Sequence, residues 1–257
     1  MGTTWDPGQY ERFAAPRLRP GLELLSRIPV ESPKRVVDLG CGTGNLTAAL
    51  AARWPGAEVI GVDHSSEMLA RAAEVAPAVR FEEGDAATYE PPAGTDILFS
   101  NACFHWVREH DQLLPRLAGS LAPGGVLAFQ IPISHTEPSH VLMREVLGEL
   151  GLGSPALVED LERPWVLGAA DYHRILAPLA RSVDVWETRY LQVLTGEDAV
   201  YEWVKGTGLR PVLEALEGED QARFISAYRS ALRDAYPARP GGTTTYPFPR
   251  LFVVASL

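Results

Sequence analysis

The sequence predicts an α/β fold built on an open, doubly wound and largely parallel sheet. An apolar run at 35–39 leads directly into a glycine turn, and this turn opens a helical pattern that begins at Asn45. Further runs with strand character follow at 57–62, 79–84, 95–101 and 126–129. Short connections and helical patterns separate these runs, and that alternation favours parallel strands joined by crossover helices.

The glycine turn is the most specific local pattern in the chain, with the sequence Asp38-x-Gly40-x-Gly42-x-Gly44. Glycine at every second position removes each Cβ atom, so the backbone can bend sharply and a ligand can lie against its amides. A dinucleotide-binding turn has the spacing Gly-x-Gly-x-x-Gly, but Asn45 stands where its third glycine would be. The alternating pattern instead resembles the first motif of the class I S-adenosylmethionine-dependent methyltransferases.

Acidic residues follow the next two apolar runs. Asp63 lies about twenty residues beyond the glycines, where an acidic side chain can accept hydrogen bonds from both hydroxyls of a ribose. At Asp85 and Ala86 the resemblance implies contacts to the adenine, and it adds Asp38 and Asn101 to the cofactor-binding set. An aspartate at a strand end can also simply form a turn or cap a helix. Their coincidence at the carboxyl ends of successive strands favours the binding role.

The pattern changes after Pro132. Helical segments are expected at 137–150, 171–179 and within 196–236, and an irregular Gly/Pro-rich stretch at 151–170. Strands are expected at 182–193 and, within 243–255, at 252–254. The terminal strand pair fits the hairpin of the class I methyltransferase fold, a seven-stranded sheet with an antiparallel last strand. Before the first strand, 5–29 predicts one or two helices broken near Pro16 and Pro20.

We therefore expect one methyltransferase domain over 1–257, with a cofactor-binding core at 31–131. The remaining helical segments, 1–30, 133–170 and 196–242, are expected to form a helical cap.

Long motifs outside the glycine turn resemble the trans-aconitate 2-methyltransferase family, from Trp5 to Val254. The motifs are Trp5-x-Pro7-x-x-Tyr10-x-x-Phe13, Arg17-x-Arg19-Pro20, Phe104-His105-Trp106, Glu137-Pro138-x-His140-Val141-Leu142-Met143-Arg144-Glu145, Trp203-Val204-x-x-Thr207-Gly208-Leu209-Arg210-Pro211 and Phe248-Pro249-Arg250-Leu251-Phe252. The resemblance implies S-adenosyl-L-methionine as the cofactor and a small tricarboxylate, trans-aconitate, as the methyl acceptor.

A carboxylate acceptor is already ionised at neutral pH, so methyl transfer to it requires no general base. Arginine forks bind carboxylates through two hydrogen bonds, and Arg144, Arg210 and Arg250 lie in motifs of the resemblance. Alternatively, Arg144 is a solvated helix position and Arg250 merely ends a strand. Arg210 follows Gly208 and precedes Pro211, where the first turn of a helix can present it to an anion.

The remaining site predictions concern aromatic and polar residues. His105 and Trp106 follow the fourth strand and are expected to form the catalytic loop. Further contacts to the acceptor are expected from Tyr10, Gln130, His140 and Trp203. Packing in the cap core is the alternative role of Trp203, as it is of Trp165.

Composition limits the other classes of function. A net charge of −10 and a pI near 5.1 argue against a nucleic-acid partner. The two cysteines are too few for a disulfide framework, and no histidine pair has the i, i+4 spacing of a helical metal site. We expect no metal, no membrane span and a cytoplasmic location. The oligomeric state stays open.

Three alternatives remain at the level of sequence. A nicotinamide-dependent dehydrogenase shares the glycine turn and the acidic strand end, but Asn45 counts against it. A methyltransferase acting on another small acid or on a natural-product hydroxyl is closer, and a hydroxyl acceptor would need a base such as His105. The third is a non-catalytic protein that binds the cofactor with the same fold.

Overall fold

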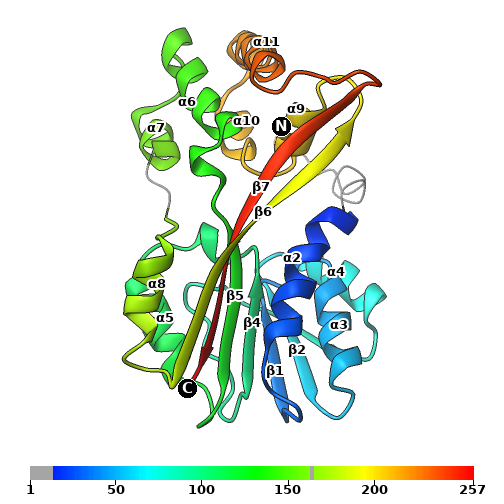
Figure 1. Cartoon of the computed structure of the whole chain (residues 1–257), viewed down its shortest axis with the longest axis vertical. Helices are drawn as coiled ribbons and strands as arrows, with labels where there is room; N and C mark the ends of the chain where they lie inside the picture. The colour runs from blue at the N-terminus through cyan, green and yellow to red at the C-terminus, as the bar shows by residue number, and fades with distance from the viewer. Residues whose placement is uncertain (1–13, 163–164) are drawn as a thin grey trace. The chain divides into compact units, whose positions relative to one another are not determined.

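The structure is a computed structural model that describes residues 14–162 and 165–257 (Figure 1). Its strands are β1 Arg35–Leu39, β2 Glu58–Asp63, β3 Arg80–Glu83, β4 Ile97–Asn101, β5 Val126–Pro132, β6 Ser182–Thr195 and β7 Thr243–Ser256. Its helices are α2 Ala14–Arg27, α3 Asn45–Arg53, α4 Ser66–Val75, α5 His110–Gly119, α6 Pro138–Leu150, α7 Pro155–Glu162, α8 Ala169–Leu176, α9 Ala199–Lys205, α10 Arg210–Ala215 and α11 Gly218–Ala235. Two single turns of 3-10 helix are η1 Phe104–Trp106 and η2 Ser134–Thr136.

The strands form one seven-stranded sheet in the order β3-β2-β1-β4-β5-β7-β6. Strands β1 to β5 pair in parallel, and β7 pairs antiparallel with β5, with Pro132 opposite Arg250 and Val126 opposite Ser256. The predicted fold class is therefore confirmed, including the antiparallel last strand. The strand order reverses direction between β1 and β4, which is where sheets of this type bind ligands.

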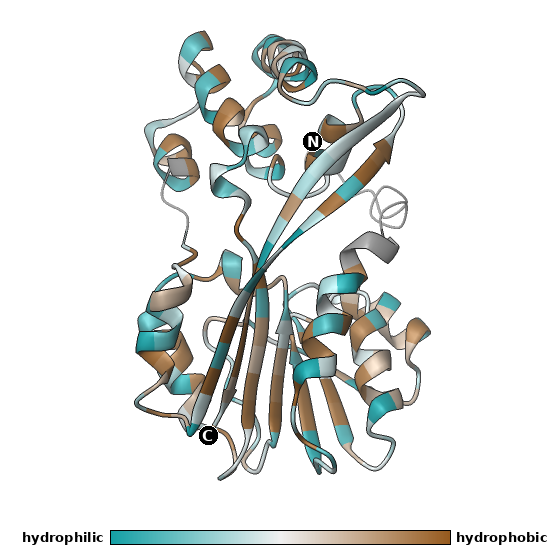
Figure 2. Ribbon diagram, viewed as in Figure 1, coloured by the Kyte–Doolittle hydropathy of each residue, from teal (hydrophilic) through white to brown (hydrophobic). Residues whose placement is uncertain are grey.

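Burial explains why the central strands read as continuous apolar runs rather than as alternating patterns. Val36 and Val37 of β1 point to opposite faces, yet both are fully buried because helices cover the parallel sheet on both sides. Leu98 and Phe99 of β4 behave in the same way. Figure 2 shows the resulting apolar band along β1, β2, β4 and β5.

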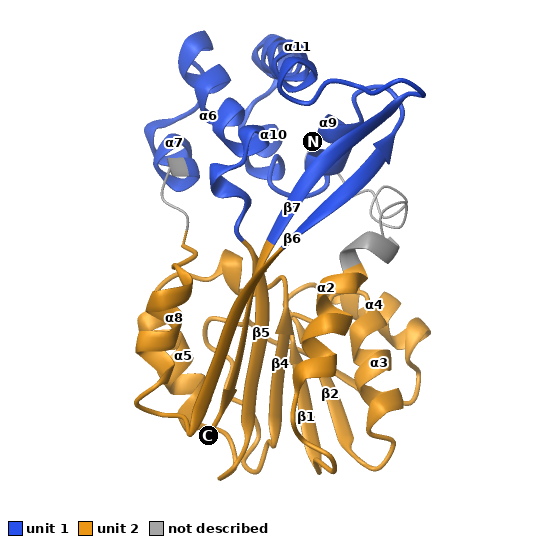
Figure 3. Cartoon of the chain, viewed as in Figure 1, with its two compact units in different colours: residues 1–16, 133–164, 189–249 blue, residues 17–132, 165–188, 250–257 orange. Residues whose placement is uncertain are grey.

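The chain divides into two compact units (Figure 3). Unit 1 comprises 1–16, 133–164 and 189–249, and unit 2 comprises 17–132, 165–188 and 250–257. Unit 2 holds the parallel strands and the glycine turn, whereas unit 1 holds α6, α7, α9, α10 and α11. Strands β6 and β7 each contribute to both units. Residues 17–30 and 165–170, which we expected in the cap, belong to the unit that contains the parallel strands.

Two expectations about helices were wrong. The predicted breaks near Pro16 and Pro20 are absent. Helix α2 runs from Ala14 to Arg27, with Pro16 in its first turn, where proline is tolerated, and with Pro20 inside it. The stretch expected to be irregular contains α7, which begins at Pro155 directly after Ser154. The Ser154 hydroxyl accepts a hydrogen bond from the Leu157 amide at 3.2 Å, and proline is favoured at the first helical position. This Ser-Pro signal was available in the sequence.

Candidate active site

The glycine turn lies at the carboxyl end of β1 and is tied to β2 through its backbone. The amides of Gly40 and Cys41 both donate to the Val62 carbonyl, at 2.8 and 2.9 Å. All three predicted glycines have positive φ angles, 81° for Gly40, 54° for Gly42 and 77° for Gly44. Side chains with a Cβ atom rarely adopt this conformation, so the turn requires glycine at each of these positions.

The three glycines differ in what surrounds them. A Cβ atom on Gly40 would lie 2.4 Å from the Cys103 side chain, and one on Gly44 would lie 2.9 Å from the Ala72 backbone in α4. A Cβ atom on Gly42 would meet nothing within 4 Å. Gly40 and Gly44 therefore allow close packing of the protein on itself, whereas Gly42 borders open space in which a ligand can contact the turn.

Asp63 ends β2 beside this open space. Its carboxylate accepts hydrogen bonds from the Gly42 amide at 2.8 Å and the Ser65 amide at 3.0 Å, and His64 Nδ1 lies 3.4 Å from it. An ionised carboxylate has about four acceptor positions, so two remain for donors such as the two hydroxyls of a ribose. The site predicted for a ribose thus has the acceptor capacity that this ligand needs.

Asp38 is buried under the same turn rather than exposed to a ligand. The Thr47 hydroxyl of α3 donates to its carboxyl group at 2.6 Å. The pKa of Asp38 is raised to about 7, chiefly by burial; the Thr47 hydrogen bond lowers it and the negative charge of Asp63 adds to the rise. The role of Thr47 could not be predicted from the sequence, because nothing in a helix of small residues marks one threonine as a partner of the preceding strand.

Asp85 and Ala86 follow β3 at the same edge of the sheet. The Asp85 side chain accepts from the Ala87 amide at 2.9 Å, and the Asp85 carbonyl accepts from the amides of Thr88 and Tyr89. The segment is therefore a tight turn with an exposed carboxylate at its start. This geometry is compatible with both the turn-forming and the adenine-binding interpretation.

Three adjacent strands contribute a row of polar side chains at the edge that carries the turn. Asn101 of β4 lies opposite Gln130 of β5, and Pro132 lies opposite Arg250 of β7. Residues opposite one another share a face of the sheet, as do alternate residues of one strand, so Asn101, Gln130 and Arg250 lie on the same face. Gln130 Nε2 donates to Asn101 Oδ1 at 2.6 Å.

Two residues of this row are deeply buried although their side chains are polar. Gln130 is only 1% exposed, yet its Oε1 atom has no hydrogen-bond partner among the described residues. Arg250 is only 8% exposed, which is unusual for a guanidinium group. Buried polar atoms are generally paired, so an unpartnered acceptor at a sheet edge marks a place for a ligand donor.

His105 and Trp106 lie in η1, directly after β4. Their rings are 4.6 Å apart, and Trp106 is 58% exposed although it is a large aromatic residue. Cys103 precedes them and packs against Gly40, and burial raises the pKa of its thiol to about 12. The catalytic loop predicted from the sequence therefore starts beside the glycine turn and presents one exposed aromatic face.

The other predicted acceptor ligands lie in unit 1, except Tyr10, which lies outside the described residues. Arg144 donates to the carbonyls of His135 and Leu161, at 3.2 and 3.4 Å, and so ties α6 to η2 and α7. Arg210 forms an ion pair with Glu214, one turn further along α10, at 2.9 Å. The Arg210 contact fits a solvated helix position, whereas Arg144 is half-buried and tied to neighbouring elements rather than solvated.

His140 and Trp203 take part in the packing of unit 1. Nδ1 of His140 lies 3.1 Å from the Ser139 hydroxyl, and its Nε2 lies 2.8 Å from where a Cβ atom of Gly208 would be. Trp203 is buried, with ring centroids 5.8 Å from Tyr246 and 5.2 Å from Phe248. Gly208 therefore provides the room that the His140 ring occupies.

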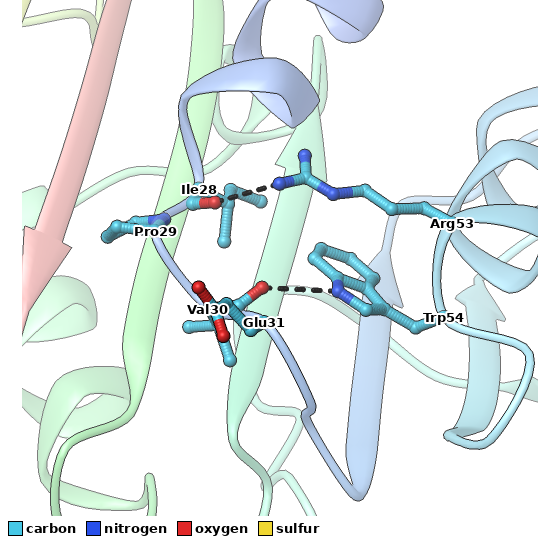
Figure 4. Close-up of a pocket in the computed structure, with 6 residues that line it drawn as sticks. All are labelled: Ile28, Pro29, Val30, Glu31, Arg53 and Trp54. Carbon is cyan, nitrogen blue, oxygen red and sulfur yellow. Dashed lines mark hydrogen bonds between the residues drawn. The ribbon is translucent and has the colours of Figure 1, made fainter.

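A cavity of about 530 Å³ lies at the opposite, amino edge of the sheet (Figure 4). Arg53 donates to the Ile28 carbonyl at 3.0 Å, and Trp54 donates its indole N–H to the Val30 carbonyl at 3.2 Å. These bonds anchor the connection between α2 and β1. The Arg53 and Trp54 side chains that line the cavity are therefore engaged in hydrogen bonds with the backbone of this connection.

Comparisons with known proteins agree with the geometry of unit 2. Residues 36–125 match the family described as "Methyltransferase domain". A trans-aconitate 2-methyltransferase of Methylobacterium nodulans is 47% identical over 251 residues, which cover 98% of this chain and 97% of that protein. The chain belongs to the trans-aconitate 2-methyltransferase family. Another trans-aconitate 2-methyltransferase, from Streptomyces avermitilis, is 46% identical, and the match covers 98% of this chain and 96% of that protein.

Solved structures share the fold of this trans-aconitate 2-methyltransferase family member. The YcgJ protein of Bacillus subtilis matches with a TM-score of 0.59 at 18% identity, over 92% of this chain and 96% of that one. Phosphoethanolamine N-methyltransferase 2 of Haemonchus contortus matches with a TM-score of 0.56 at 19% identity, over 96% of this chain and 56% of that one. The latter was solved with S-adenosylhomocysteine. The class I methyltransferase fold is thus shown.

Two further observations concern the part of the chain that the structure describes. No helix there combines the length and the apolar character that a bilayer crossing requires. No three histidine, cysteine, aspartate or glutamate side chains there form a group that could hold a metal ion.

Proposed function

We propose that the chain transfers a methyl group from S-adenosyl-L-methionine to a carboxylate of trans-aconitate and produces a monomethyl ester. The observation that carries the proposal is 47% identity, over nearly the whole of both chains, to a relative named for this reaction. The glycine turn and the row of polar side chains in unit 2 supply a compatible binding surface.

The glycine turn fits the proposed cofactor. Gly42 borders open space at the turn, and Asp63 keeps two acceptor positions after binding the turn itself. We assign the ribose to Asp63, the adenine to Asp85 and Ala86, and the remainder of the cofactor to the turn of Gly40, Gly42 and Gly44. The cofactor supplies an electrophilic methyl group on a positively charged sulfonium.

Gln130 and Trp106 fit other parts of the same ligand. The Gln130 Oε1 atom is an acceptor and needs a hydrogen-bond donor. An ionised carboxylate has no donor to offer, whereas the ammonium group of the cofactor has three. The exposed face of Trp106 suits a cation, because aromatic faces attract positive charge. Both residues therefore favour a positively charged ligand at the end of β4 and β5.

The acceptor carboxylate is already ionised, so the proposed reaction has no step in which a residue removes a proton. The protein has to hold one oxygen in line with the methyl group and keep water away, and orientation of this kind can contribute about 7–11 kcal/mol. In this scheme His105 and Trp106 orient and shield the reacting groups. His105 is not a base.

Arg250 is the strongest candidate for binding an acceptor carboxylate in unit 2. Its guanidinium is largely buried at the sheet edge, in the same row as Asn101 and Gln130. The planar fork of a guanidinium matches a carboxylate, which it can bind through two hydrogen bonds. Arg144, Arg210, His140, Trp203 and Tyr10 remain proposed acceptor ligands, with Arg210 the weakest of the arginines because Glu214 already binds it.

The test is a methylation assay with S-adenosyl-L-methionine labelled in its methyl group and a panel of di- and tricarboxylic acids. We expect a base-labile methyl ester to form fastest with trans-aconitate. The full chain carrying Asp63→Ala serves as the inactive control. Transfer to a hydroxyl compound, as a base-stable product, would assign the chain to another acceptor, and binding of cofactor without transfer to any acid would contradict the proposal.

A further inference from the structure

A buried chain of hydrogen bonds joins α5 and α8 to the loop after β4. His110, the first residue of α5, has Nε2 at 2.9 Å from the Phe104 carbonyl and Nδ1 at 2.7 Å from the Tyr172 hydroxyl of α8. The Leu167 amide donates to the same hydroxyl at 3.1 Å. Figure 1 shows α5 and α8 next to each other, and the His110 and Tyr172 rings are 5.7 Å apart.

The partners determine the direction of every bond in this chain. The Phe104 carbonyl can only accept, so Nε2 of His110 must carry the proton. With Nε2 protonated in a neutral ring, Nδ1 is an acceptor, and the Tyr172 hydroxyl donates to it. The Tyr172 oxygen in turn accepts from the Leu167 amide. Burial lowers the pKa of His110, which keeps the ring neutral and maintains this arrangement.

The carbonyl held by His110 belongs to the residue that begins the catalytic loop. Phe104 starts η1, its ring is fully buried 5.3 Å from that of Phe129, and its carbonyl also accepts from the Val107 amide at 2.8 Å. On the other side, Cys103 packs against Gly40. The segment is thus fixed by its buried parts, while Trp106 remains exposed.

Packing alone does not account for a histidine at this position. His110 is 2% exposed and Tyr172 is fully buried, and burying polar atoms costs free energy that apolar residues of similar size would not. Hydrogen bonds of defined direction, however, select one geometry of the groups that they join, which apolar contacts do less strictly.

We propose that His110 and Tyr172 are positioning residues of the methyl transfer: they hold the Phe104 carbonyl and thereby set the conformation of His105 and Trp106. This inference rests on the proposed function. Neither residue touches the reacting atoms, and both act through the backbone of η1.

Two amide substitutions separate positioning from simple packing. The amide nitrogen of glutamine occupies the place of Nε2, so His110→Gln can still donate to the Phe104 carbonyl. The amide group of asparagine matches only Nδ1, so His110→Asn can still contact Tyr172 but loses Phe104. Tyr172→Phe removes one hydroxyl and is a milder change. Trp54→Phe, which removes an indole hydrogen bond at the opposite edge of the sheet, is the matched control.

Each full-length variant is measured for kcat on trans-aconitate, for cofactor affinity by calorimetry and for thermal stability. We expect kcat to fall about tenfold to a hundredfold in His110→Asn, and less in Tyr172→Phe, with cofactor affinity unchanged. His110→Gln is expected to keep most of the wild-type kcat. Trp54→Phe is expected to lose stability without losing kcat.

Hydrogen exchange of the backbone amides at 103–107 supplies a readout that needs no acceptor. We expect faster exchange there in His110→Asn than in His110→Gln, with the rest of unit 2 unchanged. If the wild-type chain does not methylate trans-aconitate, the proposed function fails while this exchange still tests the loop. Equal kcat and equal exchange rates in His110→Asn and His110→Gln would overturn the inference. A decrease of kcat in Tyr172→Phe that is fully explained by its lower thermal stability would overturn it as well.

Discussion

The backbone amide of Gly42 donates a hydrogen bond to the Asp63 carboxylate across 2.8 Å. These residues lie 21 positions apart, at the ends of two neighbouring strands. The bond joins the turn assigned to the cofactor to the carboxylate assigned to its ribose. Loss of Asp63 should therefore affect both the turn and the ligand.

Asp63→Ala is expected to reduce S-adenosyl-L-methionine affinity strongly. Each hydrogen bond to a charged acceptor is worth about 1.5–3 kcal/mol, so loss of the ribose contacts should weaken binding at least tenfold. Asp96→Ala is the matched control, because Asp96 also accepts from two backbone amides, those of Lys34 and Arg35, but at the amino edge of the sheet. Calorimetry should show normal cofactor affinity in the control; similar affinity in both variants would contradict the ribose assignment.

Alanine substitutions at Gly42 and Gly44 should affect different properties of the protein. Both positions have positive φ, so each substitution costs about 1–2 kcal/mol of backbone strain. In Gly44→Ala the new Cβ also collides with the Ala72 backbone, and thermal stability should fall clearly further. In Gly42→Ala the Cβ meets no protein atom and stability should fall less, but cofactor affinity should be lost. Stability and affinity that fall together in both variants would refute this division of roles.

The buried Asp38 should make the protein less stable as pH rises. Its folded pKa of about 7 lies above the ordinary value of 3.8, so between these values the native state holds a proton that the unfolded chain has released. The free energy of unfolding should therefore decrease from about pH 4 to about pH 7, with a contribution of up to about 1.4 kcal/mol per pH unit, and then level off. Urea unfolding across this range should show this decrease of the free energy of unfolding in the wild type. The difference in unfolding free energy between the wild type and Asp38→Asn gives the contribution of Asp38 at each pH. Parallel curves for the two proteins would mean that Asp38 is ionised in the fold.

Arg250→Lys should impair methylation even though it keeps the charge. Lysine lacks the planar fork, so we expect a loss of about 1.5–3 kcal/mol in kcat/KM for trans-aconitate, with cofactor affinity unchanged. Arg210→Lys should have a smaller effect, because Glu214 already binds the Arg210 side chain. The comparison is made with trans-aconitate and a dicarboxylic analogue. If Arg250 binds a carboxylate that the analogue lacks, Arg250→Lys should matter less for the analogue, whereas equal losses on both acids point to a structural role.

Activity on trans-aconitate should be nearly independent of pH above the ionisation of the acid itself. The proposed reaction includes no general base, so His105→Gln should leave the shape of the pH profile unchanged at whatever rate remains. A base at this position would instead produce a fall in rate as pH drops through roughly 6.5. Such a limb, present in the wild type and absent from His105→Gln, would favour a hydroxyl acceptor.

Local patterns were sufficient for much of the fold. The strands at 35–39 and 95–101 could be predicted because buried parallel strands are continuous apolar runs. The turn at Gly40 could be predicted because alternating glycines mark a backbone with positive φ angles, which residues with a Cβ atom rarely adopt. By contrast, helix α7 begins at a short capping signal at Ser154, and α2 continues through Pro20, where a local rule predicts a break.

The sequence by itself determined the fold class, the glycine turn and the acidic residues that follow the strands. Each of these features depends on residues that are close together in the chain. Only the tertiary structure decided what each of these residues contacts. It separated Gly42, which borders open space, from Gly44, which packs on α4, and it placed His110 beside a tyrosine 62 positions away. Such contacts depend on how distant segments of the chain pack against one another, and a local periodicity or motif spacing does not predict that packing.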